Sequence, residues 1–329
     1  MEIDDGAELC FPQLLNTSCR KPTLPRSEAV FLNTLLSSIS LLTVALNLLV
    51  IISVFHFRQL HTPTNILLLS LAVSDFLVGL LLMPGEILRK TSCWFLGDLM
   101  CSLYKYVSYI ITSASVGDMV LISVDRYVAI CHPLHYTTRI TERRAKLCVC
   151  LCWFCSVLYS SLFVKYGLTQ PDRYDSCYGE CMIIINYIAE AIDLVLTFIV
   201  PITVIIVLYM RVFVVAVSQA RAMCSHITAV TLQRSVTPTA KRSELKAART
   251  LGILVLVFLI CLCPVHCVSF AGDNALNASS ASYVLYLFYF HSCLNPVIYA
   301  LFYPWFKKAI IQIVTLKILQ PGSCKANIL

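Results

Sequence analysis

Seven segments of this chain are each apolar over a length that is sufficient to cross a lipid bilayer. A helix needs roughly 20 mostly apolar residues to cross about 30 Å of hydrocarbon. Such segments occur near residues 29–56, 64–88, 98–131, 145–166, 183–217, 247–271 and 281–303. With 58% hydrophobic and only 13% charged residues, the chain is too apolar for a soluble globular protein of its size. We therefore expect an all-α membrane protein, a seven-transmembrane helix bundle.

Four prolines lie inside these apolar segments, at Pro84, Pro201, Pro264 and Pro296. A helix exposed to water tolerates an internal proline poorly, but a packed membrane bundle can satisfy the backbone groups that proline leaves free. The prolines therefore agree with membrane-spanning helices.

Positive charge is concentrated on one side of the predicted membrane. By these provisional boundaries, the segments expected to face inward hold 17 of the 25 lysines and arginines, with only Asp125, Glu142 and Glu244 as acids. The positive-inside rule then places the amino terminus outside and the carboxyl terminus inside. We interpret the net charge of +7 as a topology signal and expect no nucleic-acid partner.

The segments outside the bundle follow from this topology. Residues 1–28 are polar and acidic, so we expect no signal peptide and an extracellular segment before the transmembrane domain at 29–303. Residues 218–246 are polar and are expected to be mostly irregular. Residues 304–329 should hold a short amphipathic helix on the inner membrane surface and a cytoplasmic tail.

Two kinds of residue mark the outer side. The sequons at Asn16 and Asn277 are candidate glycosylation sites. Six of the 17 cysteines fall where disulfides persist, namely Cys10, Cys19, Cys93, Cys101, Cys177 and Cys181.

A charged group stands at the inner end of the third segment. Asp125, Arg126 and Tyr127 follow a long apolar run, and a charged pair is costly to bury there. Its presence indicates a switch.

The ordered landmarks of the chain resemble those of rhodopsin-like G-protein-coupled receptors. They are Asn47, residues 71–75 (LAVSD), Cys101, residues 125–127 (DRY), Trp153, Pro201, Tyr209, Pro264 and residues 295–299 (NPVIY). Residues 291–306 (HSCLNPVIYALFYPWF), 121–134 (LISVDRYVAICHPL), 9–11 (LCF) and 16–19 (NTSC) are similar to trace amine-associated receptors. One departure is His291, where that family usually has Asn.

The resemblance assigns roles at the inner end. Arg126 would pair with Asp125 while the bundle is closed and become free for a heterotrimeric G protein when it opens. Tyr209 and Tyr299 would stand beside Arg126 in the open state, with Asn295 and Pro296 as further switch residues.

The resemblance also implies a polar pocket in the middle of the membrane. It comprises Asp75, Ser115, Asn47, Ser292 and Asn295, whose oxygens suit a sodium ion. His291 replaces a pocket amide, so the sequence leaves open whether sodium binds. A second buried acid, Asp118, is expected to face Ser70 and Trp153 and to have a structural role.

The usual amine anchor of this superfamily is missing. Its position on the third segment holds Ser108, which cannot neutralise a cation. Asp193, eight residues before Pro201, resembles the anchoring acid of a group of trace amine-associated receptors, chiefly of fish, in which that acid has moved to the fifth segment. An unpaired carboxylate in a membrane is functional by default, although an internally paired structural Asp193 is the alternative.

Other residues are expected to line the ligand site. Glu190 and Glu86 are candidates for a second ammonium, but Lys105 could instead pair with Glu86, and Glu190 could simply face solvent. The remaining lining would come from Tyr109, Thr112, His266, Tyr286 and Tyr289. The resemblance further implies disulfides from Cys101 to Cys181 and from Cys19 to Cys177, with Cys10 as a competitor.

The sequence therefore predicts a plasma-membrane receptor for small amines with its amino terminus outside, surrounded by lipid. An olfactory role, a stimulatory G protein and cAMP come only from the resemblance. A rhodopsin-like receptor for a non-amine or neurotransmitter ligand is the alternative, and a transporter is a remote one because no repeated halves are visible. No nucleophile–base pair or metal triad is seen at one depth, so we expect no enzyme and no cofactor apart from the sodium ion.

Overall fold

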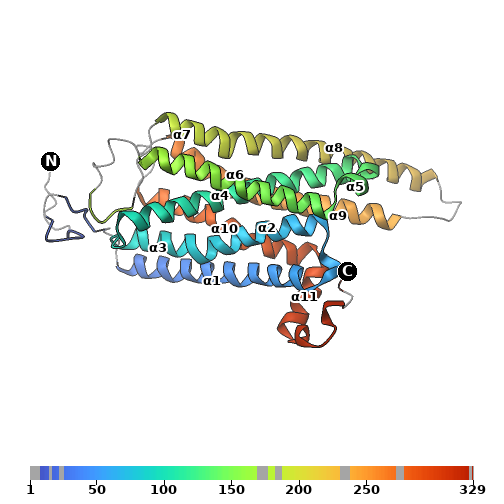
Figure 1. Cartoon of the computed structure of the whole chain (residues 1–329). Helices are drawn as coiled ribbons and strands as arrows, with labels where there is room; N and C mark the ends of the chain where they lie inside the picture. The colour runs from blue at the N-terminus through green and yellow to red at the C-terminus, as the bar shows by residue number, and fades with distance from the viewer. Residues whose placement is uncertain are drawn as a thin grey trace.

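The computed structural model is a bundle of long helices that run side by side (Figure 1). It describes residues 8–14, 17–21, 26–168, 177–181, 187–229, 238–271, 278–325 and 328. The helices of the bundle are α1 (Arg26–His56), α2 (Pro63–Leu77), α3 (Met83–Thr91), α4 (Gly97–Cys131), α6 (Glu142–Leu168), α7 (Tyr187–Leu194), α8 (Val200–Ala229), α9 (Pro238–Ala271) and α10 (Ala278–Phe302). The shorter ones are α5 (Pro133–Arg139), α11 (Pro304–Val314), η1 (Arg58–Leu60), η5 (Lys317–Leu319) and η6 (Ser323–Lys325).

Each predicted span corresponds to a helix, or to two helices joined without a break. Six helical spans in the described part of the chain are long and apolar enough to cross a membrane. In α9 the apolar stretch found there is the shorter Gly252–Val268. The all-helical fold expected from the sequence is confirmed.

Two spans contain a widened turn just before a proline. The π-helical turn η2 (Val78–Leu82) joins α2 to α3 before Pro84, and η4 (Val195–Ile199) joins α7 to α8 before Pro201. Proline has no N–H and its ring crowds the carbonyl one turn back, so a widened turn relieves the backbone while the helix continues.

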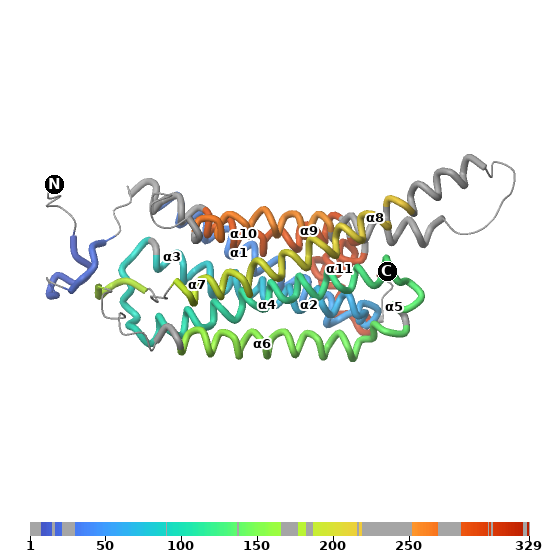
Figure 2. Tube along the Cα trace, turned by 90° about the horizontal axis from the view of Figure 1, so that it is seen from above, coloured from blue at the N-terminus to red at the C-terminus, as the bar shows by residue number. Residues whose placement is uncertain are grey.

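Helix α4 lies at the centre of the bundle and contacts α2, α6, α8 and α9. Helix α6 lies along one edge, and α1, α9 and α10 lie on the other side (Figure 2). We call the end that carries residues 8–21 the outer end and the end that carries α11 the inner end (Figure 1).

The surface of the bundle is apolar, whereas its interior holds polar groups. Phe31, Leu41 and Phe154 are more than half exposed, while Asp75, Asp118 and many other polar side chains are buried. A soluble protein would show the reverse pattern, so this surface matches a hydrocarbon solvent.

The sequence expectation for residues 218–246 was wrong. Helix α8 continues to Ala229 and α9 already begins at Pro238, on either side of residues that lie outside the described part. Twelve of these 29 residues are the good helix formers Ala, Gln, Arg, Lys and Glu. A helix already formed in the bilayer also needs no new nucleus to extend into water.

The short amphipathic helix expected after the bundle is α11. Its residues Trp305, Phe306 and Ala309 are buried against the bundle, while Lys307 and Ile311 are exposed. Helix α10 ends at Phe302, next to the predicted boundary.

Candidate ligand-binding site and switch

The candidate amine anchor, Asp193, is half-buried on α7 among aromatic side chains. The Tyr159 hydroxyl of α6 donates a hydrogen bond to its Oδ1 atom. The Tyr159 ring stacks on Phe163 at a centroid distance of 5.8 Å, and Phe163 meets Tyr109 of α4 at 4.8 Å. The carboxylate thus has a neutral donor and aromatic neighbours, and no described residue forms a salt bridge with it.

The other predicted lining residues divide between two places. The Ser108 hydroxyl donates to the Tyr104 carbonyl at 2.8 Å, so it is turned onto its own helix. Thr112 is half-buried on the same helix, and the His266 ring stacks on Phe198 of η4 at 4.3 Å. These residues do not reach Asp193 through a hydrogen bond in the described structure.

Tyr286 and Tyr289 line a cavity of about 530 Å³ on the α1 side of the bundle. Its other walls are apolar residues of α1 and α3, including Phe31, Leu35 and Met83. Neither Asp193 nor Ser108 lines this cavity.

Glu86 is buried and already has partners. Its Oε2 atom accepts hydrogen bonds from Arg89 Nε at 3.0 Å and Nη2 at 2.7 Å, and its Oε1 atom accepts one from the Tyr104 hydroxyl at 3.0 Å. The sequence expectation named Lys105 as its competing partner, whereas the hydrogen-bonded cation is Arg89. Glu190 is exposed, one turn before Asp193.

Three disulfides fix the outer end. Cys101 is joined to Cys181 and Cys19 to Cys177, as expected, and Cys10 is joined to Cys93, which resolves the competition left open by the sequence. Backbone bridges pair Leu9 with Arg20 and Ser18 with Tyr178. Residues 8–21 are thereby bound to residues 177–181.

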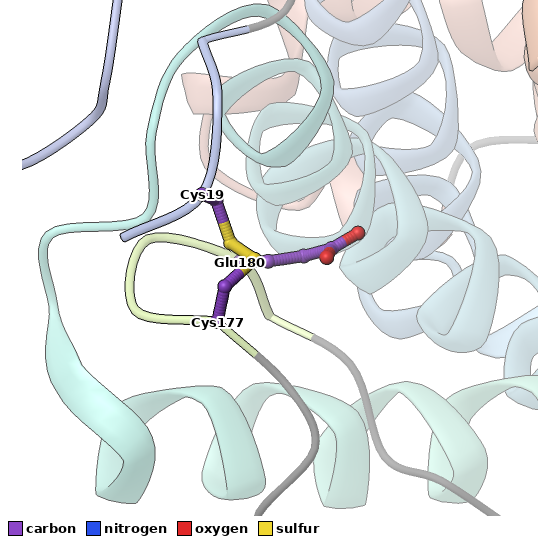
Figure 3. Close-up of side chains that lie close together, drawn as sticks. All are labelled: Cys19, Cys177 and Glu180. Atoms are coloured by element: carbon purple, nitrogen blue, oxygen red, sulfur yellow. A yellow bond between two sulfur atoms is a disulfide. The ribbon is translucent and has the colours of Figure 1, made fainter. Parts of the chain in front are cut away.

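Glu180 lies beside the Cys19–Cys177 disulfide (Figure 3). Neither sulfur is a free thiolate, so this group lacks the donors that a metal site needs. The sequons Asn16 and Asn277 lie outside the described residues.

The charged pair at the inner end is closed. Arg126 donates to Asp125 Oδ2 through Nε at 3.0 Å and Nη2 at 2.5 Å. Thr64 of α2 donates to the same oxygen at 2.9 Å and accepts from Arg126, and the Tyr136 hydroxyl of α5 donates to Asp125 Oδ1 at 3.0 Å. Burial, and then the Asp125 charge, raise the pKa of Tyr136, so its phenol stays a proton donor at physiological pH.

The other predicted switch tyrosines pack on neighbouring helices and residues. Tyr127 packs with Ile130 and Val212 of α8. Tyr299 is almost fully buried, and its ring meets Tyr303 at 6.2 Å. Tyr209 packs on Gly252, where a Cβ atom would lie 3.1 Å from the Tyr209 ring.

The polar pocket is formed, with several oxygens unpaired. Asn295 donates to Asp75 Oδ2 at 2.7 Å, and Asn47 donates to the Ser292 carbonyl at 3.0 Å. Asp75 Oδ1, Ser115 Oγ and Asn295 Oδ1 have no hydrogen-bond partner among the described residues. His291 Nε2 lies 3.8 Å from Asp75 Oδ1.

Asp118 has the structural contacts expected from the sequence. Ser70 lies 2.9 and 2.8 Å from the two Asp118 carboxyl oxygens, and Trp153 Nε1 donates to Ser70 at 3.0 Å. This network joins α2, α4 and α6.

Sequence reasoning missed Arg89, Tyr104, Tyr159, Thr64 and Tyr136. Tyr159 could have been found, because a tyrosine inside an apolar span needs a hydroxyl partner and Asp193 lacked one. Arg89, three residues after Glu86, also has the spacing of a helical ion pair. Thr64 and Tyr136 come from segments whose packing on α4 is not visible in one sequence.

Comparisons with known proteins agree with this architecture. The family described as 7 transmembrane receptor (rhodopsin family) matches residues 46–299. Trace amine-associated receptor 13c of Danio rerio is 39% identical over 98% of this chain and 97% of its own. Trace amine-associated receptor 7e of Mus musculus is 37% identical over 98% and 92%, and receptor 8a of Rattus norvegicus is 36% identical over 96% and 95%.

Proposed function

Because the chain belongs to the trace amine-associated receptors, within the rhodopsin family of seven-transmembrane receptors, we propose that Asp193 binds the ammonium of its amine ligand. The protein is a multi-pass membrane receptor and not an enzyme. Amine binding at the outer end then opens the inner end to a heterotrimeric G protein.

The observation that carries this proposal is the environment of Asp193. The carboxylate has a neutral hydrogen-bond donor, Tyr159, and no salt bridge with a described residue. An ammonium would therefore supply the missing positive charge through charge-assisted hydrogen bonds. The aromatic rings of Tyr159, Phe163 and Tyr109 would add cation–π attraction.

The test is a cAMP reporter assay of a panel of amines in cells that express the receptor. Asp193→Asn should lower amine potency by about tenfold to a hundredfold, because it removes a charged acceptor. Asp98→Asn, at an exposed carboxylate of the same outer end, is the matched control and should leave potency unchanged. Equal amine responses of Asp193→Asn and wild type would refute the anchor.

Signal transmission would use the closed pair at the inner end. In the proposal, opening separates Arg126 from Asp125 and Thr64, and the freed guanidinium meets a G protein of the stimulatory or olfactory type. Tyr209 and Tyr299, which lie in the same inner half of the bundle, would then support Arg126. The expected readout is that Arg126→Ala reaches the cell surface but produces no cAMP.

The proposed setting is the plasma membrane of sensory cells with the amino terminus outside. The concentration of lysine and arginine at the inner end supports this orientation. This orientation predicts glycans at Asn16 or Asn277. A glycosidase should remove them, and the variants Asn16→Gln and Asn277→Gln should lack them. An antibody epitope at residue 1 that is accessible only in permeabilised cells would contradict it.

A sodium ion is proposed for the polar pocket. The unpaired oxygens of Asp75, Ser115 and Asn295 fit a hard cation, and Asn47 and Ser292 would complete the wall. When bound, the ion would neutralise the buried Asp75 carboxylate and favour the closed bundle. Purified receptor should gain thermal stability in sodium chloride relative to choline chloride, and Asp75→Asn should lose that gain.

A further inference from the structure

A buried ion pair occupies the side of the outer end that lies across α4 from Asp193. Glu86 and Arg89 on α3 are 4% and 14% exposed in their side chains, and their charged atoms approach to 2.7 Å. Tyr104 of α4 donates to the remaining Glu86 oxygen at 3.0 Å. Both oxygens of Glu86 are therefore engaged within the protein.

The Tyr104 ring packs closely against α3, next to this ion pair. A Cβ atom on Gly85 would lie 2.3 Å from the Tyr104 ring, so the ring can lie against α3 only because residue 85 is glycine. The Tyr104 hydroxyl is also 3.1 Å from the carbonyl of Leu82, the last residue of the π-helical turn. A second cation, Lys105, lies 6.0 Å from the centre of the Tyr104 ring.

Helix geometry places the pair and the Asp193 cluster against neighbouring faces of α4. At 3.6 residues per turn, Tyr104 and Tyr109 project about 140° apart around α4, and Ser108 lies between them. Tyr104 contacts Glu86 of α3, whereas Tyr109 contacts Phe163 in the Asp193 cluster. A ligand that extends from Asp193 past Ser108 therefore approaches Glu86 and Arg89 with its far end.

We propose that Arg89 determines specificity by occupying, from within the chain, the position that a second ligand ammonium would take at Glu86. The inference rests on the proposed function. The receptor then accepts amines with one ammonium and an uncharged far end, and it discriminates against diamines. Glu190 does not alter this conclusion, because it is one turn from Asp193 on the same helix and serves the same end of the ligand.

The physical reason is charge. A carboxylate that already accepts two hydrogen bonds from a guanidinium on one oxygen and one from a tyrosine on the other gains little from a second cation, and that cation would also be repelled by Arg89. Displacing Arg89 would leave its guanidinium unpaired in a largely buried site, which is strongly unfavourable. An apolar ligand end meets neither cost.

The first experiment compares hexylamine with hexamethylenediamine on the wild-type receptor by cAMP reporter. Hexylamine should be at least about tenfold more potent, which corresponds to about 1.4 kcal/mol. Equal potency of the two amines, or a more potent diamine, would overturn the inference. Asp193 would remain the anchor in that case if Asp193→Asn still lowered both responses.

The second experiment releases Glu86. Arg89→Ala should raise the potency of hexamethylenediamine relative to hexylamine by about tenfold, because the freed carboxylate can bind the second ammonium. Arg89→Lys, which keeps a cation, and the double variant Glu86→Gln with Arg89→Ala, which keeps neither charge, should show no such gain. Should Arg89→Ala fail to reach the cell surface, Arg89→Gln retains a donor for Glu86 and takes its place.

These results separate the possible failures. A purely structural Arg89 would give variants with less surface receptor and an unchanged ratio of the two potencies, which contradicts the inference. Failure of both amines on a wild-type receptor that is at the surface, or full amine responses in Asp193→Asn, would instead refute the proposed function.

Discussion

At the scale of single residues, one hydroxyl group connects the two charges of the switch. Thr64 donates to Asp125 and accepts from Arg126, so it adds two hydrogen bonds to the pair that we propose to hold the inner end closed. It also lies in the first turn of α2, two residues after the Thr62 cap. In the proposed mechanism, the closed state therefore includes an α2 contact that must break on opening.

Replacing Thr64 with valine, which has the same shape but no hydroxyl, should raise basal signalling. A hydrogen bond to a charged group contributes about 1.5–3 kcal/mol, so the ratio of open to closed receptor should rise by about tenfold. Basal cAMP at equal surface expression is the measurement. Thr138→Val is the control, because the Thr138 hydroxyl donates to the His135 carbonyl within α5. Basal cAMP that is unchanged by Thr64→Val would contradict the role of Thr64 in the closed state.

The candidate site was predictable only in part at this scale. Asp193 was singled out because an acid inside an apolar segment is conspicuous and because its position resembles the anchoring acid of a group of trace amine-associated receptors. Its partner Tyr159 was not predicted, and neither was the pairing of Arg89 with Glu86. A tyrosine inside a span and an arginine near its end are both common, and only the packed structure shows which groups they contact. Cys10 likewise found its partner, Cys93, only through the folded outer end.

At the scale of elements, α4 and α6 meet at a position where no side chain fits. A Cβ atom on Gly117 would lie 2.4 Å from the Cys152 sulfur atom. The neighbouring Asp118–Ser70–Trp153 network joins the same helices. The central helix is thus held to α6 by close approach and by buried hydrogen bonds together.

Gly117→Ala should destabilise the bundle through this contact. An added methyl group in a packed core costs about 1–3 kcal/mol, so the thermal unfolding temperature of the purified receptor should fall. Cys152→Ala removes the clashing sulfur and should restore most of the loss when combined with Gly117→Ala. An unfolding temperature that falls equally in the single and double variants would show that the sulfur contact is not the cause.

Elements were predicted well inside the bilayer and poorly beyond it. Length and apolarity define a span because a helix must satisfy its own backbone in hydrocarbon. Water imposes no such requirement, so the extensions of α8 to Ala229 and of α9 back to Pro238, and the short α5, depended on helix propensity and packing. The segment 218–246 was mispredicted for that reason.

At the scale of the whole molecule, disulfides fix the outer end, and hydrogen bonds of Arg126 join helices at the inner end. We call residues 8–21 and 177–181 the lid, and the contacts of Arg126 with Asp125 and Thr64 the lock. Residues 8–21 are tied to residues 177–181 by the Cys19–Cys177 disulfide and to the connection between α3 and α4 through Cys93. Asp193 is on α7, the next described helix after the lid, and Arg126 at the inner end is held by Asp125 and Thr64. Ligand residence and signalling should thus respond to different parts of the molecule.

Removing the Cys10–Cys93 disulfide should test this separation. The double variant Cys10→Ser with Cys93→Ser keeps the Cys19–Cys177 tether but frees the first part of the lid from α3 and α4. A native disulfide contributes about 2–4 kcal/mol to stability, so the unfolding temperature should fall, and amines should dissociate faster because the cover is looser. Basal cAMP should stay at the wild-type level, since the lock at Arg126 is untouched. Cys324→Ser, at a free cysteine near the other end, is the control. Unchanged amine dissociation, or a raised basal signal, would contradict the division between lid and lock.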